Sequence, residues 1–229
     1  MPRLDGLSKF YALMDRLEER QGPKRNLSEC SGHMPWPKRG VYFFFEDGEL
    51  RSDSGNGPRV VRVGTHALKD SFRTSLWNRL SQHKGVAKTG GGNHRGSVFR
   101  KIVGAALSQR NPNIAISTWG VGASAPRVIR SKEYGLETKI STIIGMMPFL
   151  WLAVEDTPGP ESLRGYIERN SIALLSNFGK APLDLPSPNW LGNAYPKDRV
   201  RASGLWNSNH VNKSYDPKFI DVLEDLIEQ

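Results

Sequence analysis

Hydrophobic and polar residues alternate along this chain with two different periods. Near the start, apolar side chains recur every three or four positions, which predicts an amphipathic helix over residues 5–20. The runs GVYFFFE (residues 40–46) and RVVRVG (residues 59–64) are rich in β-branched and aromatic residues, and a polar, glycine-rich segment joins them. This pattern predicts a β-hairpin with a long loop. The apolar run around residues 147–154 predicts a third, buried strand.

Helical periods dominate the rest of the chain. They cover about residues 97–109, 132–145, 160–176 and 217–228, and IAISTWG (residues 114–120) allows a short strand. We therefore predict an α+β fold with a small antiparallel or mixed three-stranded sheet flanked by helices. The predicted parts are an N-terminal helix and linker (1–37), a core (38–178) with a helical insertion at about 86–145, and a C-terminal extension (179–229) that packs on the core.

The stretch SLWNRLSQHKG, residues 75–85, departs from simple amphipathicity. On a helix, Phe72, Leu76 and Leu80 form one apolar stripe, and Arg79 and His83 fall within the same arc. A cation on an inward arc is costly unless it faces a cleft or is paired. Arg79 therefore either faces a functional cleft or lies in a buried ion pair. His83 is either a functional residue or a satisfied structural histidine.

Positive charge is concentrated in one part of the sequence. The net charge is +9, yet residues 71–132 contain eleven Lys and Arg and no Asp or Glu, which leaves the rest of the chain slightly negative. Such segregation is typical of a face that binds a polyanion, and we favour nucleic acid. The alternative is a generally basic surface that has no ligand.

Several other classes of protein are excluded or disfavoured by the sequence. Cys30 is the single cysteine, so no intramolecular disulfide forms, and the start of the chain lacks the apolar segment of a signal peptide. The longest apolar run is too short to cross a bilayer. We therefore expect a cytoplasmic protein. There is no GxxxxGK motif, and Cys30 with His33 offers too few ligands for zinc.

Four short motifs occur in a specific order. Gly40, Val41 and Tyr42 open the first strand of the hairpin, and the second strand ends in Arg62, Val63 and Gly64. Arg79 and His83 follow on one helix, and Glu168 lies on a later helix. In this combination the chain resembles the GIY-YIG nuclease family, in its restriction-endonuclease-like branch. The resemblance covers roughly residues 38–85 and 147–178. Arg62 departs from the family pattern because it replaces the tyrosine of the second motif.

The resemblance implies roles for individual residues. Tyr42 would act as general base or position the attacking water, and Arg79 would bind the scissile phosphate. His83 would assist the base or contact phosphate. Glu168 would hold one Mg²⁺, with Mn²⁺ as the alternative metal. The family also has a polar group after that helix, for which we favour Asn177 over Asn189. Each of these residues also has a purely structural interpretation, such as a half-buried strand tyrosine for Tyr42 or a surface glutamate for Glu168.

Two further stretches are candidates for contacts with nucleic acid. GGGNHRGSVFRK contains His94, Arg95, Arg100 and Lys101, which either clamp the phosphate backbone or belong to a merely flexible loop. RASGLWNSNHV near the C-terminus contains Asn207, which either contacts DNA or packs on the core. Arg62 is a third candidate for a DNA contact.

The leading hypothesis is a Mg²⁺-dependent endonuclease that hydrolyses DNA phosphodiester bonds, in a restriction or mobile-element role rather than as a repair subunit. A homodimer is expected if both strands are cut. The alternative is a non-catalytic DNA- or RNA-binding protein on the same scaffold, which the presence of Arg62 favours. A third hypothesis is an unrelated α/β domain whose basic segment meets another acidic partner.

Overall fold

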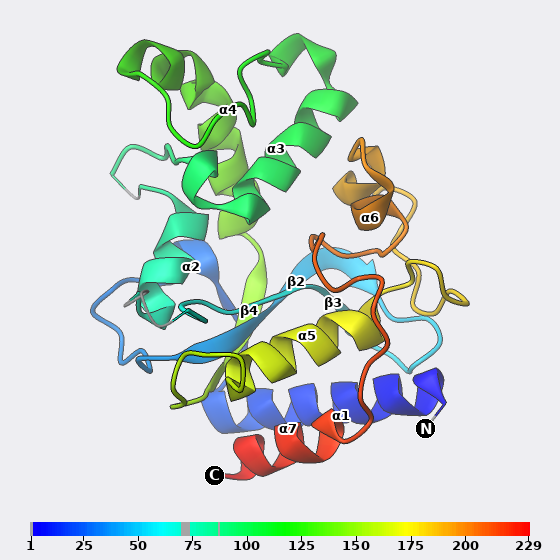
Figure 1. Ribbon diagram of the computed structural model, residues 1–229. Helices are drawn as coiled ribbons and strands as arrows, with labels where there is room; N and C mark the ends of the chain where they lie inside the picture. The colour runs from blue at the N-terminus through cyan, green and yellow to red at the C-terminus, as the bar shows by residue number, and fades with distance from the viewer. Residues whose placement is uncertain (1, 70–73, 87) are drawn as a thin grey trace.

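The computed structural model describes residues 2–69, 74–86 and 88–229, and Phe72 lies outside these ranges. The described residues form an α+β fold around one antiparallel sheet with the strand order β1-β4-β2-β3 (Figure 1). The strands are β1 (Arg25–Asn26), β2 (Gly40–Leu50), β3 (Pro58–Gly64) and β4 (Pro148–Ala153). The sheet therefore has four strands instead of the three predicted. Its extra strand, β1, has only two residues, which is too short to produce a periodic pattern.

The hairpin of β2 and β3 brings two of the motifs together. Tyr42 pairs with Gly64 on β3 and with Trp151 on β4, so it lies in the central part of the sheet. A Cβ atom at position 64 would collide with the ring and the hydroxyl group of Tyr42. Glycine at position 64 therefore allows the Tyr42 side chain to cross the neighbouring strand.

Three helices cover one face of the sheet: α1 (Arg3–Gln21), α5 (Leu163–Leu175) and α7 (Phe219–Glu228) (Figure 1). Their apolar side chains pack with Val41, Phe43 and Phe45, which alternate with Tyr42 and Phe44 along β2. Burial of this face explains the helical period at both ends of the sequence. It also places Glu168, on α5, beside the strand ends.

The other face is covered by α2 (Leu76–Lys84), α3 (Val98–Arg110) and α4 (Arg127–Gly145). Side chains of all three helices share one cluster with Tyr42, Phe44 and Phe149, and Trp190 and Trp206 of the C-terminal extension join it. The insertion and the extension are thus integral to the core. A short helix, α6 (Asp198–Arg201), lies in the extension.

The segment between α3 and α4 contains no strand. The short strand considered for residues 114–120 is replaced by a 3₁₀ helix, Pro112–Ile114, and a turn. Other 3₁₀ helices lie at Leu27–Glu29, His94–Gly96 and Leu191–Ala194. No helix in the described ranges combines the length and the apolar character needed to cross a membrane.

Candidate active site

A buried tyrosine and histidine form the centre of the candidate site. The hydroxyl group of Tyr42 on β2 lies 2.8 Å from Nε2 of His83 on α2, and neither side chain is exposed to solvent. The guanidinium group of Arg62 on β3 lies near the Tyr42 side chain and donates to the carbonyl oxygen of Trp206. The tyrosine hydroxyl therefore has two nitrogen-bearing neighbours from two different elements.

His83 is held from its far side by a serine. Its Nδ1 lies 2.7 Å from Oγ of Ser97, which also caps the N-terminus of α3 by accepting from the amide of Arg100. Burial, together with Arg79, Arg62 and Arg100, lowers the pKa of His83 well below its usual value. The imidazole is therefore neutral near pH 7, so one ring nitrogen donates and the other accepts.

Arg79 lies one turn before His83 and is half-buried. Its Nη1 donates to Oε1 of Gln82 at 3.0 Å and to the carbonyl oxygen of Gly96 at 3.1 Å, and its buried Nε has no hydrogen bond to any residue that the structure describes. Within the described ranges it forms no ion pair. Of the two interpretations of this inward cation, the structure therefore favours the one in which Arg79 faces a cleft.

Glu168 approaches the same place from α5. Its Oε1 accepts a hydrogen bond from the amide of Thr65 at 3.2 Å, and no hydrogen bond reaches Oε2 from the part of the chain that the structure describes. Burial raises the pKa of the Glu168 carboxyl, and the charge of Arg62 opposes that effect. A cation near Oε2 would favour the ionised form.

Two hollows meet at Arg79 and Glu168. One, of about 390 Å³, is also lined by Thr65 and His66. The other, of about 120 Å³, is also lined by Arg62 and by Asn207 to His210. Tyr42 and His83 are not among the residues that line the two hollows, whereas Arg62, which interacts with Tyr42, lines the second hollow. The order of the elements and the convergence of these side chains match the motifs of the sequence.

The family is decided by comparison with known protein domains. A model of the GIY-YIG domain matches residues 1–229, the whole of this chain. The chain belongs to the GIY-YIG family. GIY-YIG proteins are in general endonucleases that act on DNA. No curated protein and no solved structure matches the chain significantly.

Two residues of the GIY-YIG site were missed by sequence reasoning. Ser97 precedes a helical pattern, which predicts an N-cap but not a contact with a histidine fourteen residues earlier. His66 follows the second motif, and its Nδ1 lies 2.8 Å from the carbonyl oxygen of Thr74. Its Nε2 is buried and has no hydrogen-bond partner among the described residues, and burial lowers the pKa of His66 to about 4. No pattern in the sequence indicates this environment.

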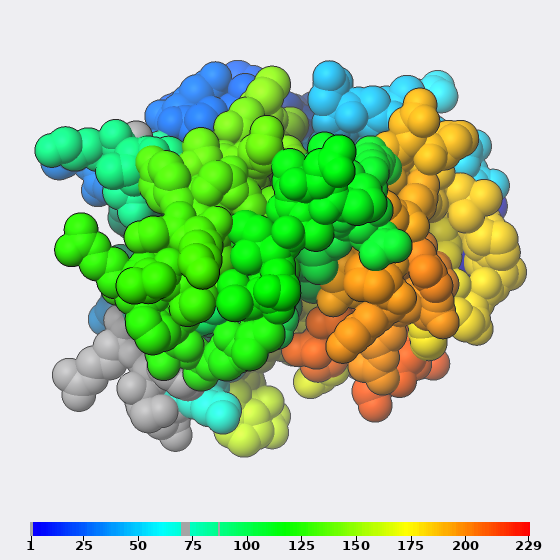
Figure 2. Space-filling view, turned by 90° about the horizontal axis from the view of Figure 1, so that it is seen from above, coloured from blue at the N-terminus to red at the C-terminus, as the bar shows by residue number. Residues whose placement is uncertain are grey.

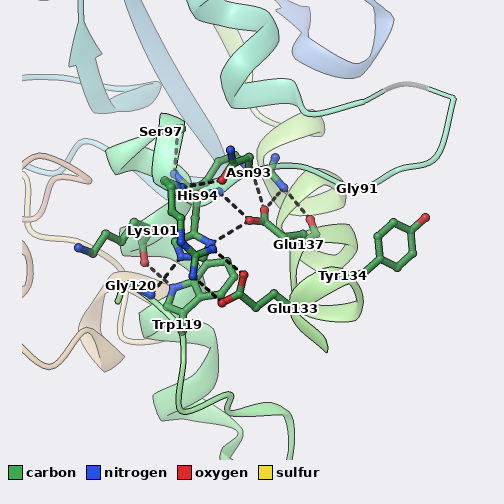
Figure 3. A network of polar contacts seen from close by, with 12 residues as sticks. Gly91, Asn93, His94, Ser97, Lys101, Trp119, Gly120, Glu133, Tyr134 and Glu137 are labelled. Carbon is green, nitrogen blue, oxygen red and sulfur yellow. Dashed lines mark hydrogen bonds and ion pairs between the residues drawn. The ribbon is translucent and has the colours of Figure 1, made fainter. Parts of the chain in front are cut away.

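The basic residues proposed to clamp DNA have a different place. His94 and Arg100 are buried and bond to Glu137, and Arg95 forms a two-fold ion pair with Glu133 (Figure 3). A Cβ atom at Gly92 would collide with the guanidinium group of Arg100, so this glycine serves internal packing. The positions of these three basic side chains do not favour a direct phosphate contact, because their donors already have protein partners. Lys101 is exposed.

Of the three other residues predicted to contact nucleic acid, two line the second hollow and one lies elsewhere. Asn177 lies away from the hollows and bonds to Arg3 and to the backbone of Leu183. Asn207 lines the second hollow, and its side-chain amide pairs with both backbone groups of Val63. Arg62 lines the same hollow. The structure thus brings Tyr42, Arg62, Arg79, His83, Glu168 and Asn207 together and leaves Asn177 outside.

The acidic residues near the hollows limit how a metal can bind. No group of three or more His, Cys, Asp or Glu that could hold a metal occurs among the described residues. Mg²⁺ commonly takes one or two carboxylates and completes its shell with water and phosphate oxygens. Glu168, with Oε2 free of protein hydrogen bonds beside the hollows, fits such a site.

Proposed function

We propose that this protein is a metal-dependent endonuclease that hydrolyses phosphodiester bonds of DNA at the site around Tyr42 and Glu168. The observation that carries the proposal is the buried hydrogen bond between the Tyr42 hydroxyl and neutral His83, next to Arg62, which lines the second hollow together with Arg79 and Glu168. Hydrolysis requires a base, positive charge on the phosphate and help for the leaving oxygen, and these side chains can supply the first two requirements.

The Tyr42–His83 pair would orient the attacking water. Tyrosine alone is a poor base near neutral pH because its unperturbed pKa is about 10. Because burial and the neighbouring arginines keep His83 neutral, its Nε2 can accept a hydrogen bond from the Tyr42 hydroxyl, whose oxygen can in turn accept a hydrogen bond from the attacking water and orient it. Ser97 would hold the His83 ring in place for this role. Its hydroxyl can donate to Nδ1 or accept from it, and so fits either tautomer of His83.

Arg62 controls access to Tyr42 in this proposal. Its guanidinium group lies near the tyrosine and lines the second hollow, and no hydrogen bond from the described residues reaches its buried Nε. Movement of this group onto a bound phosphate would satisfy Nε and uncover the Tyr42 hydroxyl. Arg62 would thus replace the missing tyrosine of the second motif with a phosphate contact.

Arg79 and Glu168 would face the scissile phosphate from opposite sides of the hollows. Within the described residues, Nε of Arg79 has no hydrogen-bond partner, which suits a planar guanidinium that binds phosphate oxygens. Glu168 would hold Mg²⁺ or Mn²⁺ through Oε2. The metal, when bound, supplies positive charge that stabilises the phosphate as negative charge develops on it.

The second candidate function is binding of DNA or RNA without cleavage. It is favoured by one observation: Tyr42 is completely buried and does not line the hollow that its neighbour Arg62 lines. If Arg62 does not move, the tyrosine cannot reach a water bound beside a phosphate.

Supercoiled plasmid distinguishes the two functions. Purified protein is incubated with plasmid in Mg²⁺ or Mn²⁺, and in EDTA as control. Metal-dependent nicking or linearisation supports the endonuclease. Intact plasmid over a range of DNAs and both metals, with retarded migration at low salt, supports the binding protein.

A further inference from the structure

Two glutamates determine the surface charge of the insertion, residues 86–145. The segment contains nine basic residues and two acidic ones, Glu133 and Glu137. Both glutamates are buried on α4, and Figure 3 shows them directed toward His94 and Trp119. They are neutralised there by Arg95 and Arg100, the two basic residues of the segment that are themselves buried or nearly so. Both negative charges of the insertion are therefore compensated by buried ion pairs within the insertion itself.

The remaining charges of the insertion are all positive and exposed. Arg110 is tied to the carbonyl oxygens of Asn189 and Trp190. In the described ranges the other exposed cations form neither an ion pair nor a side-chain hydrogen bond: Lys88, Lys101, Arg127, Arg130, Lys132 and Lys139. Lys132 and Lys139 lie on the other flank of α4 from Arg127 and Arg130, because their spacing turns them by more than 100° around the helix. We therefore call the other four side chains, Lys88, Lys101, Arg127 and Arg130, the insertion face. In the view from above, residues of α3 and α4, in green, form a broad part of the surface (Figure 2).

The insertion face contains a groove. A hollow of about 430 Å³ is lined by Gly92, Arg127, Arg130, Ser131 and Tyr134. The spacing of Arg127, Arg130 and Tyr134 places them on one side of α4. Tyr134 points away from the buried network (Figure 3), and its hydroxyl donates to the carbonyl oxygen of Thr89. The charged groups that line the groove are both guanidiniums, which suit phosphate oxygens.

We propose that the insertion face binds the phosphate backbone of duplex DNA next to the cleavage site. The choice of DNA rests on the proposed function, whereas the choice of this surface rests on its charge. A single exposed aromatic side chain, Tyr134, lies in the groove, so the stacking platform expected for single strands is lacking among the described residues there. Backbone contacts to a duplex need only positive charge.

The insertion face begins close to the hollows of the active site. Val98, at the start of α3, lines the second hollow, and Lys101 follows one turn later on the same side of the helix. The turn containing Trp119 and Gly120 packs on Lys101 and Arg95, and it leads to α4. A duplex whose scissile phosphate meets Arg79 could therefore extend along this face.

The test is the salt dependence of binding, measured by fluorescence anisotropy with a 20-base-pair duplex in EDTA, where no metal-dependent cleavage occurs. The variant Arg127→Gln/Arg130→Gln is compared with wild type and with Lys9→Gln/Lys218→Gln. The control changes the net charge equally at two exposed, unpaired lysines on or beside α1 and α7. Arg127→Lys/Arg130→Lys keeps the charge.

The slope of log K against log salt should become shallower by about 0.9 for each lost phosphate contact, hence by about 1.8 in the double variant. The Lys9/Lys218 variant and the Arg-to-Lys variant should keep slopes near that of wild type. Equal slopes in wild type and Arg127→Gln/Arg130→Gln would overturn the inference. So would an equal loss in the Lys9/Lys218 control.

A second measurement needs no variant. Duplex DNA should protect the amines of Lys88 and Lys101 from acetylation in wild type, as read by mass spectrometry, while Lys9 and Lys218 stay reactive. Unprotected Lys88 and Lys101 in a saturated complex would overturn the inference.

The failure of the two proposals can be told apart. Binding with a shifted slope but no cleavage in any metal would refute the endonuclease and keep the insertion face. Metal-dependent cleavage together with equal slopes in wild type and Arg127→Gln/Arg130→Gln would keep the endonuclease and refute the insertion face.

Discussion

The hydroxyl group of Tyr42 lies 2.8 Å from Nε2 of His83, and both side chains are completely buried. Tyr42→Phe removes only this hydroxyl. If it accepts a hydrogen bond from the attacking water, cleavage should fall by about 10²–10⁴-fold. The free energy of unfolding should fall by about 1–3 kcal/mol, because the buried Nε2 loses its partner. Plasmid nicking and urea unfolding measure the two effects. Unchanged nicking would exclude Tyr42 from the chemistry.

We expect Glu168 to lower the stability of the metal-free protein and to be required for cleavage. Burial raises the pKa of its carboxyl, so at neutral pH the ionised side chain costs stability in the absence of a metal. Glu168→Gln should therefore abolish cleavage while the melting temperature in EDTA stays the same or rises. The matched control is Glu161→Gln, at an exposed glutamate just before α5. A variant that keeps metal-dependent nicking would show that Glu168 does not hold the metal.

Ser97 should act as a positioning residue through His83. Ser97→Ala removes the hydroxyl that contacts Nδ1 and caps α3. Cleavage should fall roughly tenfold, equivalent to about 1.4 kcal/mol, and stability should fall by about 1 kcal/mol. Ser97→Thr keeps the hydroxyl and should restore both.

A purely structural serine gives a different result for the same pair of variants. Ser97→Ala would then lose stability but keep the pH profile of cleavage. A shift of that profile in Ser97→Ala, restored in Ser97→Thr, is the result that a role through His83 requires.

The buried His83 predicts how stability depends on pH. Its pKa in the folded protein is far below the unfolded value of 6.5, so the unfolded chain binds the proton first as pH falls. The stability due to neutral His83 is complete above pH 6.5 and is lost as pH falls below that value toward the folded pKa.

Urea unfolding at pH 7.5 and 5.5 tests this sign. The difference in unfolding free energy between wild type and His83→Gln should be smaller at pH 5.5, because glutamine does not titrate. His66, whose pKa is about 4 in the folded protein, contributes in the same direction to both proteins and cancels in the comparison. A difference independent of pH would contradict the buried neutral histidine.

Gly64 should be required because Tyr42 crosses it. Gly64→Ala places a methyl group against the ring and hydroxyl of Tyr42, so the tyrosine must move. Stability should fall by about 1–3 kcal/mol, and cleavage should fall with it. Gly135→Ala on α4 is the control, because a Cβ atom at this position would have no atom of another described residue within 4 Å. This substitution should stabilise the protein by about 0.5–1 kcal/mol, since alanine favours the helix more than glycine does. Equal effects of the two substitutions on thermal unfolding would refute the argument.

Much of the fold could be predicted because its elements are amphipathic. One face or stripe is buried in each of the hairpin strands, in β4 and in the helices α1, α3, α5 and α7. Such burial produces a repeating pattern of apolar residues within the segment itself, which the sequence shows directly. β1 was not predicted because its two residues are too few to show an alternating pattern of apolar and polar side chains. The extent of α4, which begins at Arg127 instead of near residue 132, was underestimated because its first turn is largely exposed, Val128 included, and so adds nothing to the buried stripe of the helix.

The candidate site divides in the same way. The sequence by itself determined the order of Tyr42, Arg62, Arg79, His83 and Glu168, the inward arc of Arg79 and His83, and the concentration of positive charge in one segment. Only the tertiary structure decided which charges remain outside. Arg95 and Arg100 lie inside because α4, more than thirty residues later, brings Glu133 and Glu137 to them. Ser97 reaches His83 for the same reason: contacts between distant segments depend on how helices pack, which no local pattern records.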